Sequence, residues 1–301
     1  MKTSKALITG MSGFTGRYLA LELESAGYAV YGIGSKPLPI PNYHVADLAN
    51  PEALEVVINA IEPDVVIHLA AIAYVAHGNA KDFYAINLMG TYNLLQALGK
   101  AKKPPRSVLL ASSANVYGNS TAGVITEETP PAPANDYAVS KLAMEHMARL
   151  WMDRLPIQIA RPFNYTGVGH SSSFLLPKIV DHFRRGAKEI ELGNLEVWRD
   201  FSDVRSVVAA YRRLIEIERP GNIVNICSGT SYSLKEIIGM MELISGREIN
   251  VRVNPAFVRS NEVKQLRGDP TKLKELIGEW QIYPLEDTLK WMLFEPESHP
   301  V

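Results

Sequence analysis

Cysteine is almost absent from this sequence of 301 residues, which contains only Cys227. A single cysteine excludes any disulfide within the chain, so the fold must be stabilised by the packing of its core. With 47% hydrophobic residues, a chain of this length can form one large domain or two smaller ones. Cys227 ends an apolar run that starts at Asn222, so we expect a buried strand and a small core side chain there.

Neither sign of charge is in excess, and long apolar runs are also missing. Lys and Arg number 31 against 32 for Asp and Glu, a formal net charge of −1. This balance argues against nucleic-acid and membrane partners, and no run approaches the ~20 apolar residues of a membrane span. Residues 5–9 lead into glycines rather than a cleavage site, so we expect a cytoplasmic protein. No two histidines have metal-ligand spacing, so we expect no metal site.

Three spaced glycines follow the first apolar run. Gly10, Gly13 and Gly16 stand between a predicted strand at 5–9 and a helical pattern that extends to about residue 26. In this context, glycines allow the backbone to approach a dinucleotide pyrophosphate, which lies at the helix N-terminus. The spacing is G-x-x-G-x-x-G. A simple glycine turn is the alternative, and the flanking strand and helix argue against it.

The end of the second predicted strand, residues 29–34, determines which nicotinamide cofactor is expected. An acidic residue there would hold the 2′-hydroxyl of NAD, but Ser35 and Lys36 follow instead. Lys36, with help from Arg17, suits the 2′-phosphate of NADP(H), which is the predicted cofactor. The alternative is that Lys36 only begins a solvated loop.

Apolar runs alternate with helical patterns as far as about residue 164. This alternation predicts an α/β fold with a doubly wound parallel sheet of the Rossmann type. Further along, the regularity weakens, and we expect a smaller α+β lobe that carries substrate specificity. The expected division assigns 1–164 and about 203–229 to the cofactor domain, and 165–202 and 230–301 to the lobe. Expected elements include a helix at 79–99, a strand at 189–192 and a helix at 204–218.

A tyrosine and a lysine four residues apart are the main candidates for chemistry. Tyr137 and Lys141 lie one turn apart on one helix face. A phenol has a pKa near ~10, and a neighbouring ammonium favours the phenolate, which suits proton transfer to a carbonyl oxygen. Ser113 adds a hydroxyl for the same oxygen. Y-x-x-x-K also occurs by chance in amphipathic helices, so its weight comes from the surrounding motifs.

Six motifs in order make the sequence similar, nearly end to end, to the extended short-chain dehydrogenase/reductases that act on nucleotide sugars. They are G-x-x-G-x-x-G at 10–16, H-L-A-A at 68–71, I-N-L-x-G-T at 86–91, S-S-x-x-V-Y-G at 112–118, Y-A-V-S-K at 137–141 and A-R-P-F-N at 160–164.

The resemblance implies a catalytic set and a cofactor site. Ser113, Tyr137 and Lys141 match the catalytic residues. The expected cofactor-binding residues are Gly10, Ser12, Gly13, Phe14, Thr15, Gly16, Ser35, Lys36, Asp47, Leu48, Leu69, Ala70, Ala71, Asn87, Tyr137, Lys141 and Pro162. His68, at a strand end, is expected to be structural.

The resemblance also bears on the substrate. Sugar 4,6-dehydratases commonly carry an acid after the catalytic serine, whereas this chain has Ala114 and Asn115, which leaves keto-sugar reduction or 4-epimerisation. Residues 193–201 and 259–270 are similar to segments of GDP-mannose-processing members, with two arginines as diphosphate ligands. The expected substrate-binding residues are Ser112, Ser113, Asn115, Asn164, Lys178, Arg199, Arg259 and Glu262. A solvated surface charge is the alternative for either arginine.

The resemblance therefore implies NADPH-dependent reduction of the C4 keto group of a GDP-4-keto-6-deoxy-hexose, with GDP-D-rhamnose as product. The alternatives are a 4-epimerase, a GDP-mannose 4,6-dehydratase and a non-catalytic NADP-binding protein. The family also commonly dimerises through the 79–99 and Tyr137 helices, so a homodimer with a four-helix bundle is expected. Asp136 replaces the usual proline before Tyr137, and we expect it to start the helix and point away from the phenol.

Overall fold

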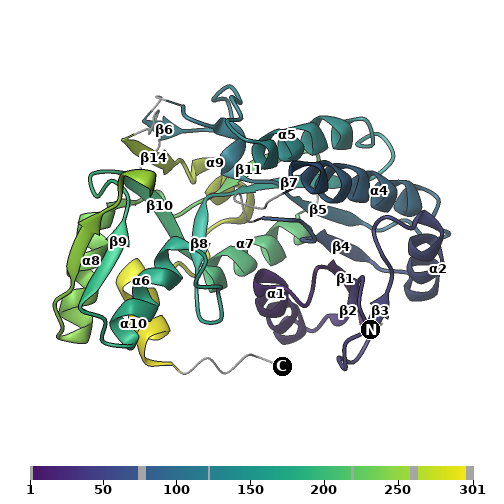
Figure 1. The fold of residues 1–301 in the computed structure, drawn as a ribbon. Helices are drawn as coiled ribbons and strands as arrows, with labels where there is room; N and C mark the ends of the chain where they lie inside the picture. Colours follow the sequence, from purple (N-terminus) through teal and green to yellow (C-terminus); the bar gives the residue numbers. More distant parts are fainter. Residues whose placement is uncertain (1–2, 74–78, 121–122, 218–219, 258–263, 296–301) are drawn as a thin grey trace.

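The computed structural model describes residues 3–73, 79–120, 123–217, 220–257 and 264–295 (Figure 1). A central parallel sheet with helices on both faces forms one part, and a smaller lobe lies at one end of it. Among the described helices, none is both long enough and apolar enough to cross a bilayer.

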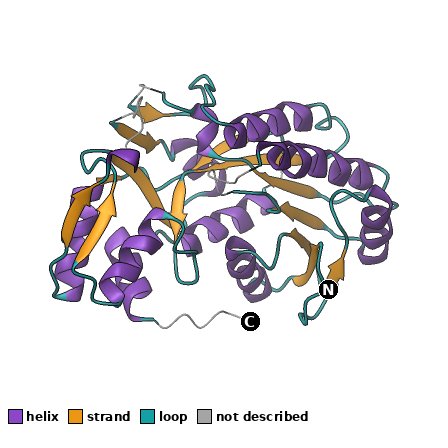
Figure 2. Cartoon of the chain, viewed as in Figure 1, coloured by secondary structure: helices purple, strands orange, loops and turns teal. Residues whose placement is uncertain are grey.

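Seven parallel strands form the central sheet (Figure 2). In spatial order they are β11 (Ile223–Ile226), β7 (Ile157–Pro162), β5 (Ser107–Ala111), β4 (Val65–His68), β1 (Lys5–Thr9), β2 (Ala29–Gly34) and β3 (Tyr43–Val45). The order reverses between β1 and β4, and ligands of such sheets bind at the carboxyl ends of the strands beside this reversal. The predicted doubly wound sheet is confirmed.

Alternating side chains of the strands bury the two faces of this sheet. In β1, Ala6 and Ile8 pack into one core and Leu7 packs into the other, as the period of two requires. The first core lies under α1 (Phe14–Ser25), α7 (Val204–Glu216) and α9 (Thr271–Ile277). The second lies under α2 (Pro51–Ile61), α4 (Thr91–Gly99) and α5 (Asp136–Arg149).

The lobe contains a second sheet and three helices around its own apolar core. Its strands follow the order β12 (Ser231–Ser233), β10 (Trp198–Asp203), β14 (Gln265–Gly268) and β6 (Val124–Ile125), with β8 (Asn164–Thr166) paired to β10. β13 (Asn250–Val253) pairs with β9 (Glu189–Leu192). The helices are α6 (Leu175–Arg184), α8 (Leu234–Ser245) and α10 (Leu285–Phe294), and short 3₁₀ turns are η2 (Ala114–Tyr117) and η3 (Pro255–Phe257).

Two elements cross the division expected from the sequence. β6, from the N-terminal half, joins the lobe sheet beside β14. α9, from the C-terminal quarter, returns to the central sheet, where Leu273 and Ile277 pack into the core under α7. The helix expected at 79–99 is also not uniform: α3 (Ala80–Asp82) leads into a π-helix, η1 (Phe83–Gly90), and then into α4.

His68 closes β4 and is fully partnered, as expected for a structural residue. Its Nε2 lies 2.8 Å from Thr91 Oγ1 and its Nδ1 lies 2.6 Å from Thr9 Oγ1. Thr91 uses its own proton on the Asn87 carbonyl, so it must accept from Nε2, and Nδ1 accepts from Thr9. Burial, with the charge of Lys141 as a smaller cause, lowers the pKa of His68 to about 3.

This neutral histidine predicts a pH dependence of stability. The unfolded state protonates His68 near pH ~6.5 whereas the folded state does not, so stability is lost as pH falls from 6.5 toward 3, by about 2 kcal/mol at pH 5. Urea unfolding of the wild type and of His68→Gln at pH 7.5 and 5.0 measures this loss. We expect a smaller loss in the variant; equal losses would contradict the assignment.

Candidate active site

A large cleft opens where the carboxyl ends of the central strands meet the lobe. Its lining runs from Gly10 in the glycine turn to Phe257 beside the small β9–β13 sheet. The volume of about 1140 Å³ exceeds the ~300–1,000 Å³ of ordinary small-molecule pockets. The cleft can therefore hold two ligands side by side.

The glycine turn forms one wall of this cleft and is packed too tightly for side chains. A Cβ on Gly10, whose φ is +74°, would lie 2.8 Å from the backbone nitrogen of Ala70. A Cβ on Gly16 would lie 2.3 Å from the carbonyl oxygen of Gly10. The N-terminus of α1 has no side-chain cap and no acidic residue in its first turn. Its free backbone N–H groups therefore suit an anionic group.

Ser113, Tyr137 and Lys141, the three residues predicted to be catalytic, all line the cleft. Tyr137 and Lys141 lie on α5, with 6% and 3% of their surfaces exposed, and Ser113 follows β5. The Ser113 hydroxyl lies beside the Tyr137 phenol, where as a hydrogen-bond donor it lowers the pKa of the phenol. Both the backbone N–H and the amide of Asn115 donate to Ser113 Oγ, each at 3.1 Å. These two bonds occupy the oxygen as acceptor and leave its proton for the phenol.

The pKa of Tyr137 corrects one expectation. Burial raises it to about 12, and the hydrogen bond from Ser113 only partly opposes this. Burial likewise lowers the pKa of Lys141 to about 8, with Glu145 opposing. The expected lowering of the phenol pKa by Lys141 is therefore wrong for this state of the protein, because desolvation dominates. Lys141 Nζ instead donates to the carbonyl oxygen of Ala111 at 2.8 Å.

A buried ion pair connects the elements that carry these residues. Arg161 of β7 donates to both carboxylate oxygens of Glu145 on α5, at 2.9 and 2.6 Å. Glu145 also accepts from Ser112 Oγ at 2.5 Å, and Arg161 donates to the Tyr117 hydroxyl at 2.9 Å. The network therefore fixes the segment that carries Ser113 relative to the helix that carries Lys141.

Positive charge dominates the described lining of the cleft. Arg17, Lys141, Lys178 and Arg199 contribute cations, and Glu191 is the sole acidic residue among the described lining residues. Arg17 lies at the glycine turn, whereas Lys178 and Arg199 belong to the lobe. The arrangement suits two diphosphate groups, one at each end of the cleft.

Comparisons with known proteins agree with this geometry. A family model described as GDP-mannose 4,6 dehydratase matches residues 7–292. A GDP-6-deoxy-D-mannose reductase from Pseudomonas aeruginosa is 35% identical over 98% of both chains. A GDP-6-deoxy-D-talose 4-dehydrogenase from Aggregatibacter actinomycetemcomitans is 35% identical over 91% of both. The chain belongs to the extended short-chain dehydrogenase/reductases.

Two solved structures of this family are similar over nearly the whole chain. One, from Burkholderia cenocepacia J2315, is described as a candidate epimerase; it is 52% identical, with a TM-score of 0.92 over 96% of this chain and 97% of that one. The other is RMD from P. aeruginosa in complex with NADPH; it is 34% identical, with a TM-score of 0.85 over 97% and 96%. The expected family, fold and enzyme class are thus confirmed.

Most of the other residues predicted for the site line the cleft. These are Gly10, Gly13, Phe14, Thr15, Gly16, Leu69, Ala71, Asn115, Pro162, Asn164, Lys178 and Arg199. Ala70 packs against Gly10. Outside the lining, Ser12 is an exposed residue of the glycine turn, and Ser35, Lys36, Asp47 and Leu48 follow the ends of β2 and β3. Arg259 and Glu262 lie outside the described residues.

Two predicted contact residues have other roles. Asn87 is fully buried in the π-helix, where its amide pairs with the backbone of Ile72 in both directions and donates to Ser140. It therefore positions the loop after β4. Ser112 lines the cleft but gives its hydroxyl proton to Glu145, so that this proton is used inside the core. Asp136 points to Tyr84, as expected from its place at the helix start.

Three ring-bearing residues of the cleft, Tyr165, His170 and Phe174, were missed by sequence reasoning. Phe14 stacks on His170 at 4.3 Å, and His170 stacks on Phe174 at 4.3 Å, so the glycine turn contacts the loop before α6. The Tyr165 hydroxyl lies 2.8 Å from Thr15 Oγ1. In the sequence, only the position of Tyr165 directly after A-R-P-F-N could have indicated it.

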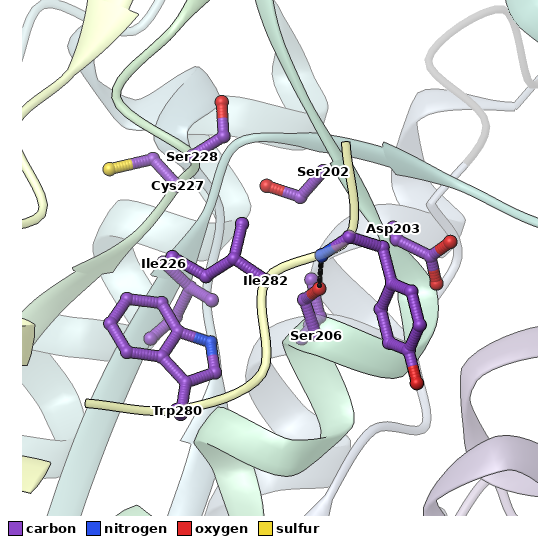
Figure 3. Close-up of a pocket in the computed structure, with 10 residues that line it drawn as sticks. Ser202, Asp203, Ser206, Ile226, Cys227, Ser228, Trp280 and Ile282 are labelled. Carbon is purple, nitrogen blue, oxygen red and sulfur yellow. Dashed lines mark hydrogen bonds between the residues drawn. The ribbon is translucent and has the colours of Figure 1, made fainter. Parts of the chain in front are cut away.

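A second, much smaller cavity lies between α7 and the segment 280–283 (Figure 3). The backbone N–H of Tyr283 donates to Ser206 Oγ beside it, at 3.0 Å. Trp280 Nε1 is buried with no hydrogen-bond partner in the described part of the chain. The volume of about 10 Å³ leaves room for about one water molecule, so this cavity is not a substrate site.

The buried ion pair generates a stability prediction. Glu145→Met leaves the Arg161 charge buried and unpaired, so we expect a loss of about 3–5 kcal/mol in the free energy of unfolding. The double variant Glu145→Met, Arg161→Met removes both charges and should lose much less. Urea denaturation of both variants is the measurement. A double variant as unstable as the single one would contradict this reason, because its loss could not come from an unpaired buried charge.

Proposed function

We propose that the protein reduces the C4 keto group of a GDP-4-keto-6-deoxy-hexose with NADPH. The observation that carries the proposal is the Ser113–Tyr137–Lys141 set in the lining of a cationic cleft with room for two ligands. The 35% identity to a GDP-6-deoxy-D-mannose reductase supports the same substrate class. The NADPH complex of RMD supports the cofactor.

The described residues fit a nicotinamide dinucleotide. Gly10, Gly13 and the uncapped start of α1 would hold its pyrophosphate, with Arg17 beside them. Lys141 would bind the nicotinamide ribose. β2 ends in Gly34 and carries no carboxylate for a 2′-hydroxyl, which favours NADP(H) over NAD(H).

When bound, NADPH supplies the hydride that reduces C4. Tyr137 donates its phenolic proton to the C4 oxygen, so the ketone gains one hydride and one proton and becomes an alcohol. The raised pKa of Tyr137 keeps this proton on the phenol at neutral pH, and the developing alkoxide is a far stronger base. Ser113 orients the carbonyl oxygen, and Lys141 stabilises the phenolate until solvent returns a proton.

The cleft argues against water elimination. A 4,6-dehydratase needs an acid and a base beside the sugar, and Asn115 occupies the position where such enzymes carry a carboxylate. Glu191, the single described carboxylate of the lining, belongs to β9 in the lobe and accepts from Asn254. A non-catalytic NADP-binding protein is disfavoured by the intact, hydrogen-bonded catalytic set.

Reduction at C4 can give either of two configurations in the product. 6-Deoxy-D-mannose and 6-deoxy-D-talose differ at C4 alone, and relatives named for each are equally identical to this chain. We propose the manno product, GDP-D-rhamnose, with the talo product as the alternative. The description of the 52% identical structure supports a 4-epimerase as a further candidate. An epimerase, however, must keep its cofactor bound and return the hydride to the sugar in each cycle.

The decisive experiment is a coupled reaction of GDP-mannose, a GDP-mannose 4,6-dehydratase, NADPH and this protein. We expect consumption of NADPH and a product whose proton NMR couplings at C4 identify its configuration. A new sugar formed without net NADPH consumption would indicate an epimerase. Conversion of GDP-mannose by this protein alone would indicate a dehydratase.

Tyr137→Phe is the matched control for that experiment. It removes one hydroxyl, so we expect turnover to fall by about 10²–10⁴-fold or more, with NADPH affinity nearly unchanged. Ser113→Ala should reduce turnover less. Full activity in Tyr137→Phe would end the proposed mechanism.

We also propose a homodimer whose interface is a four-helix bundle of η1–α4 and α5 from each subunit. The supporting observation is an apolar stripe at helical spacing on η1–α4, where Ile86, Met89 and Tyr92 are 38%, 50% and 36% exposed. Val139 of the neighbouring helix α5 is also exposed. Two such pairs of helices could bury these side chains against each other.

The dimer proposal predicts that Met89→Glu yields monomers, because it places a charge in the apolar stripe. Light scattering of the wild type and the variant measures the mass. Leu243→Glu is the control, since Leu243 is an exposed apolar residue on α8 of the lobe and lies outside the stripe. A wild-type monomer, or a dimer that survives Met89→Glu, would refute this interface.

A further inference from the structure

We propose that Tyr43 is a specificity-determining residue that selects NADPH by hydrogen-bonding the 2′-phosphate from the place normally filled by an acidic side chain. This inference rests on the proposed function for its cofactor but goes beyond it. Tyr43 belongs to no motif and does not line the large cleft.

The inference begins at Gly34, the last residue of β2. In NAD-binding sheets of this kind, an acidic side chain near this strand end holds the ribose 2′-hydroxyl. A Cβ built on Gly34 would lie 1.8 Å from the Tyr43 hydroxyl oxygen and 2.9 Å from its Cζ. The hydroxyl of Tyr43 thus occupies the space that the side chain at position 34 would need.

The strand pairing holds the Tyr43 ring in this place. Tyr43 is opposite Gly32 in the parallel β2–β3 pair, and its ring extends along β2 toward Gly34. A Cβ on Gly32 would lie 2.8 Å from Tyr43 Cδ2 and 2.6 Å from Met11 Cε of the glycine turn. The ring therefore packs directly on the backbone of Gly32 and Gly34, next to the glycine turn proposed to bind the cofactor.

The turn before β3 reinforces the position. Asn42 adopts a left-handed conformation, with φ of 56°, and its carbonyl accepts from the backbone N–H of Gly32 at 3.0 Å. Gly34 in turn accepts, through its carbonyl oxygen, from the backbone N–H of Ala46 at 3.0 Å. Backbone hydrogen bonds on both sides of Tyr43 thus fix its register against β2.

The chemistry of this hydroxyl suits a phosphate. Among the described residues, the Tyr43 hydroxyl has no hydrogen-bond partner, although its ring is half-buried. A phenol donates one strong hydrogen bond to an anionic oxygen, whereas it cannot accept from both ribose hydroxyls as a carboxylate does. Ser35 and Lys36, both exposed, follow directly and add a further donor and a cation. Tyr43 therefore both replaces the residue that NAD needs and contributes a ligand that NADP needs.

The alternative is that Tyr43 only packs over the two glycines. Tyr43→Phe distinguishes this packing role from phosphate binding, because it keeps the ring and removes only the hydrogen-bond donor. Tyr31→Phe is the matched control: Tyr31 lies on β2 beside Gly32, but its side chain packs into the core on the opposite face of the sheet.

The experiment is a fluorescence titration of each protein with NADPH and with NADH, without any sugar. We expect Tyr43→Phe to weaken NADPH binding about 10-fold or more, since a hydrogen bond to a charged group contributes ~1.5–3 kcal/mol, and to leave NADH binding unchanged. Tyr31→Phe should leave both affinities unchanged. NADPH affinity within twofold of the wild type, or equal losses for both cofactors, would overturn the role of Tyr43.

A second variant tests whether Tyr43 disfavours NADH by occupying the place of an acidic side chain. Gly34→Asp, combined with Tyr43→Ala to make room, restores the acid at the strand end. We expect NADPH affinity to fall and NADH affinity to rise, and an unchanged preference would overturn the proposal. Because these titrations contain no sugar, they are independent of the coupled reduction assay. A wild type that binds neither cofactor would refute the proposed function itself.

Discussion

The buried ion pair between Arg161 and Glu145 is the interaction on which the rest of the site depends. It joins β7 to α5 beneath the cleft, and through Ser112 it fixes the segment that carries Ser113. Both partners are almost completely buried, so the pair survives only because each charge has several hydrogen-bond partners. We expect the pair to fix the relative positions of β7 and α5 more than to add to the free energy of unfolding. It aligns the hydroxyl, the phenol and the ammonium without any of them lying at a flexible loop tip.

Both parts of the molecule contribute positive charge to the cleft. The cofactor domain contributes Arg17 and a free helix N-terminus, and the lobe contributes Lys178 and Arg199. Below Arg199, the buried Asp200 accepts from the backbone N–H groups of Ser228, Gly229 and Gly268, which ties the ends of β11 and β14 to β10. In the proposed reaction, the carbonyl would lie between the diphosphates of the cofactor and the substrate. Anchoring at both ends is how such a cleft converts binding energy into orientation.

Sequence reasoning failed where burial or a neighbour's competing bond decided the outcome. The pKa of Tyr137 was expected to fall, but it rises because desolvation outweighs the hydrogen bond from Ser113. Asn87 was predicted to contact the cofactor, and its amide forms hydrogen bonds with the backbone of Ile72. The Tyr43 ring reaches Gly34 only through the β2–β3 register, which no motif records. Each case depends on which atoms lie within a few ångströms, and spacing along the chain does not encode that.

Local patterns by themselves determined the doubly wound sheet, the glycine turn, the place of Tyr137 and Lys141 on one helix, and elements such as the strand at 189–192. These follow from short-range rules: alternation along a strand, one turn along a helix, and glycine where backbones touch. Only the tertiary structure decided that β6 joins the lobe, that α9 returns to the central sheet, and that four cations from distant segments face one cleft. The reason is physical. A side chain's burial, its partners and its charge state are set by contacts between residues far apart in sequence, and those contacts exist only once the chain has folded.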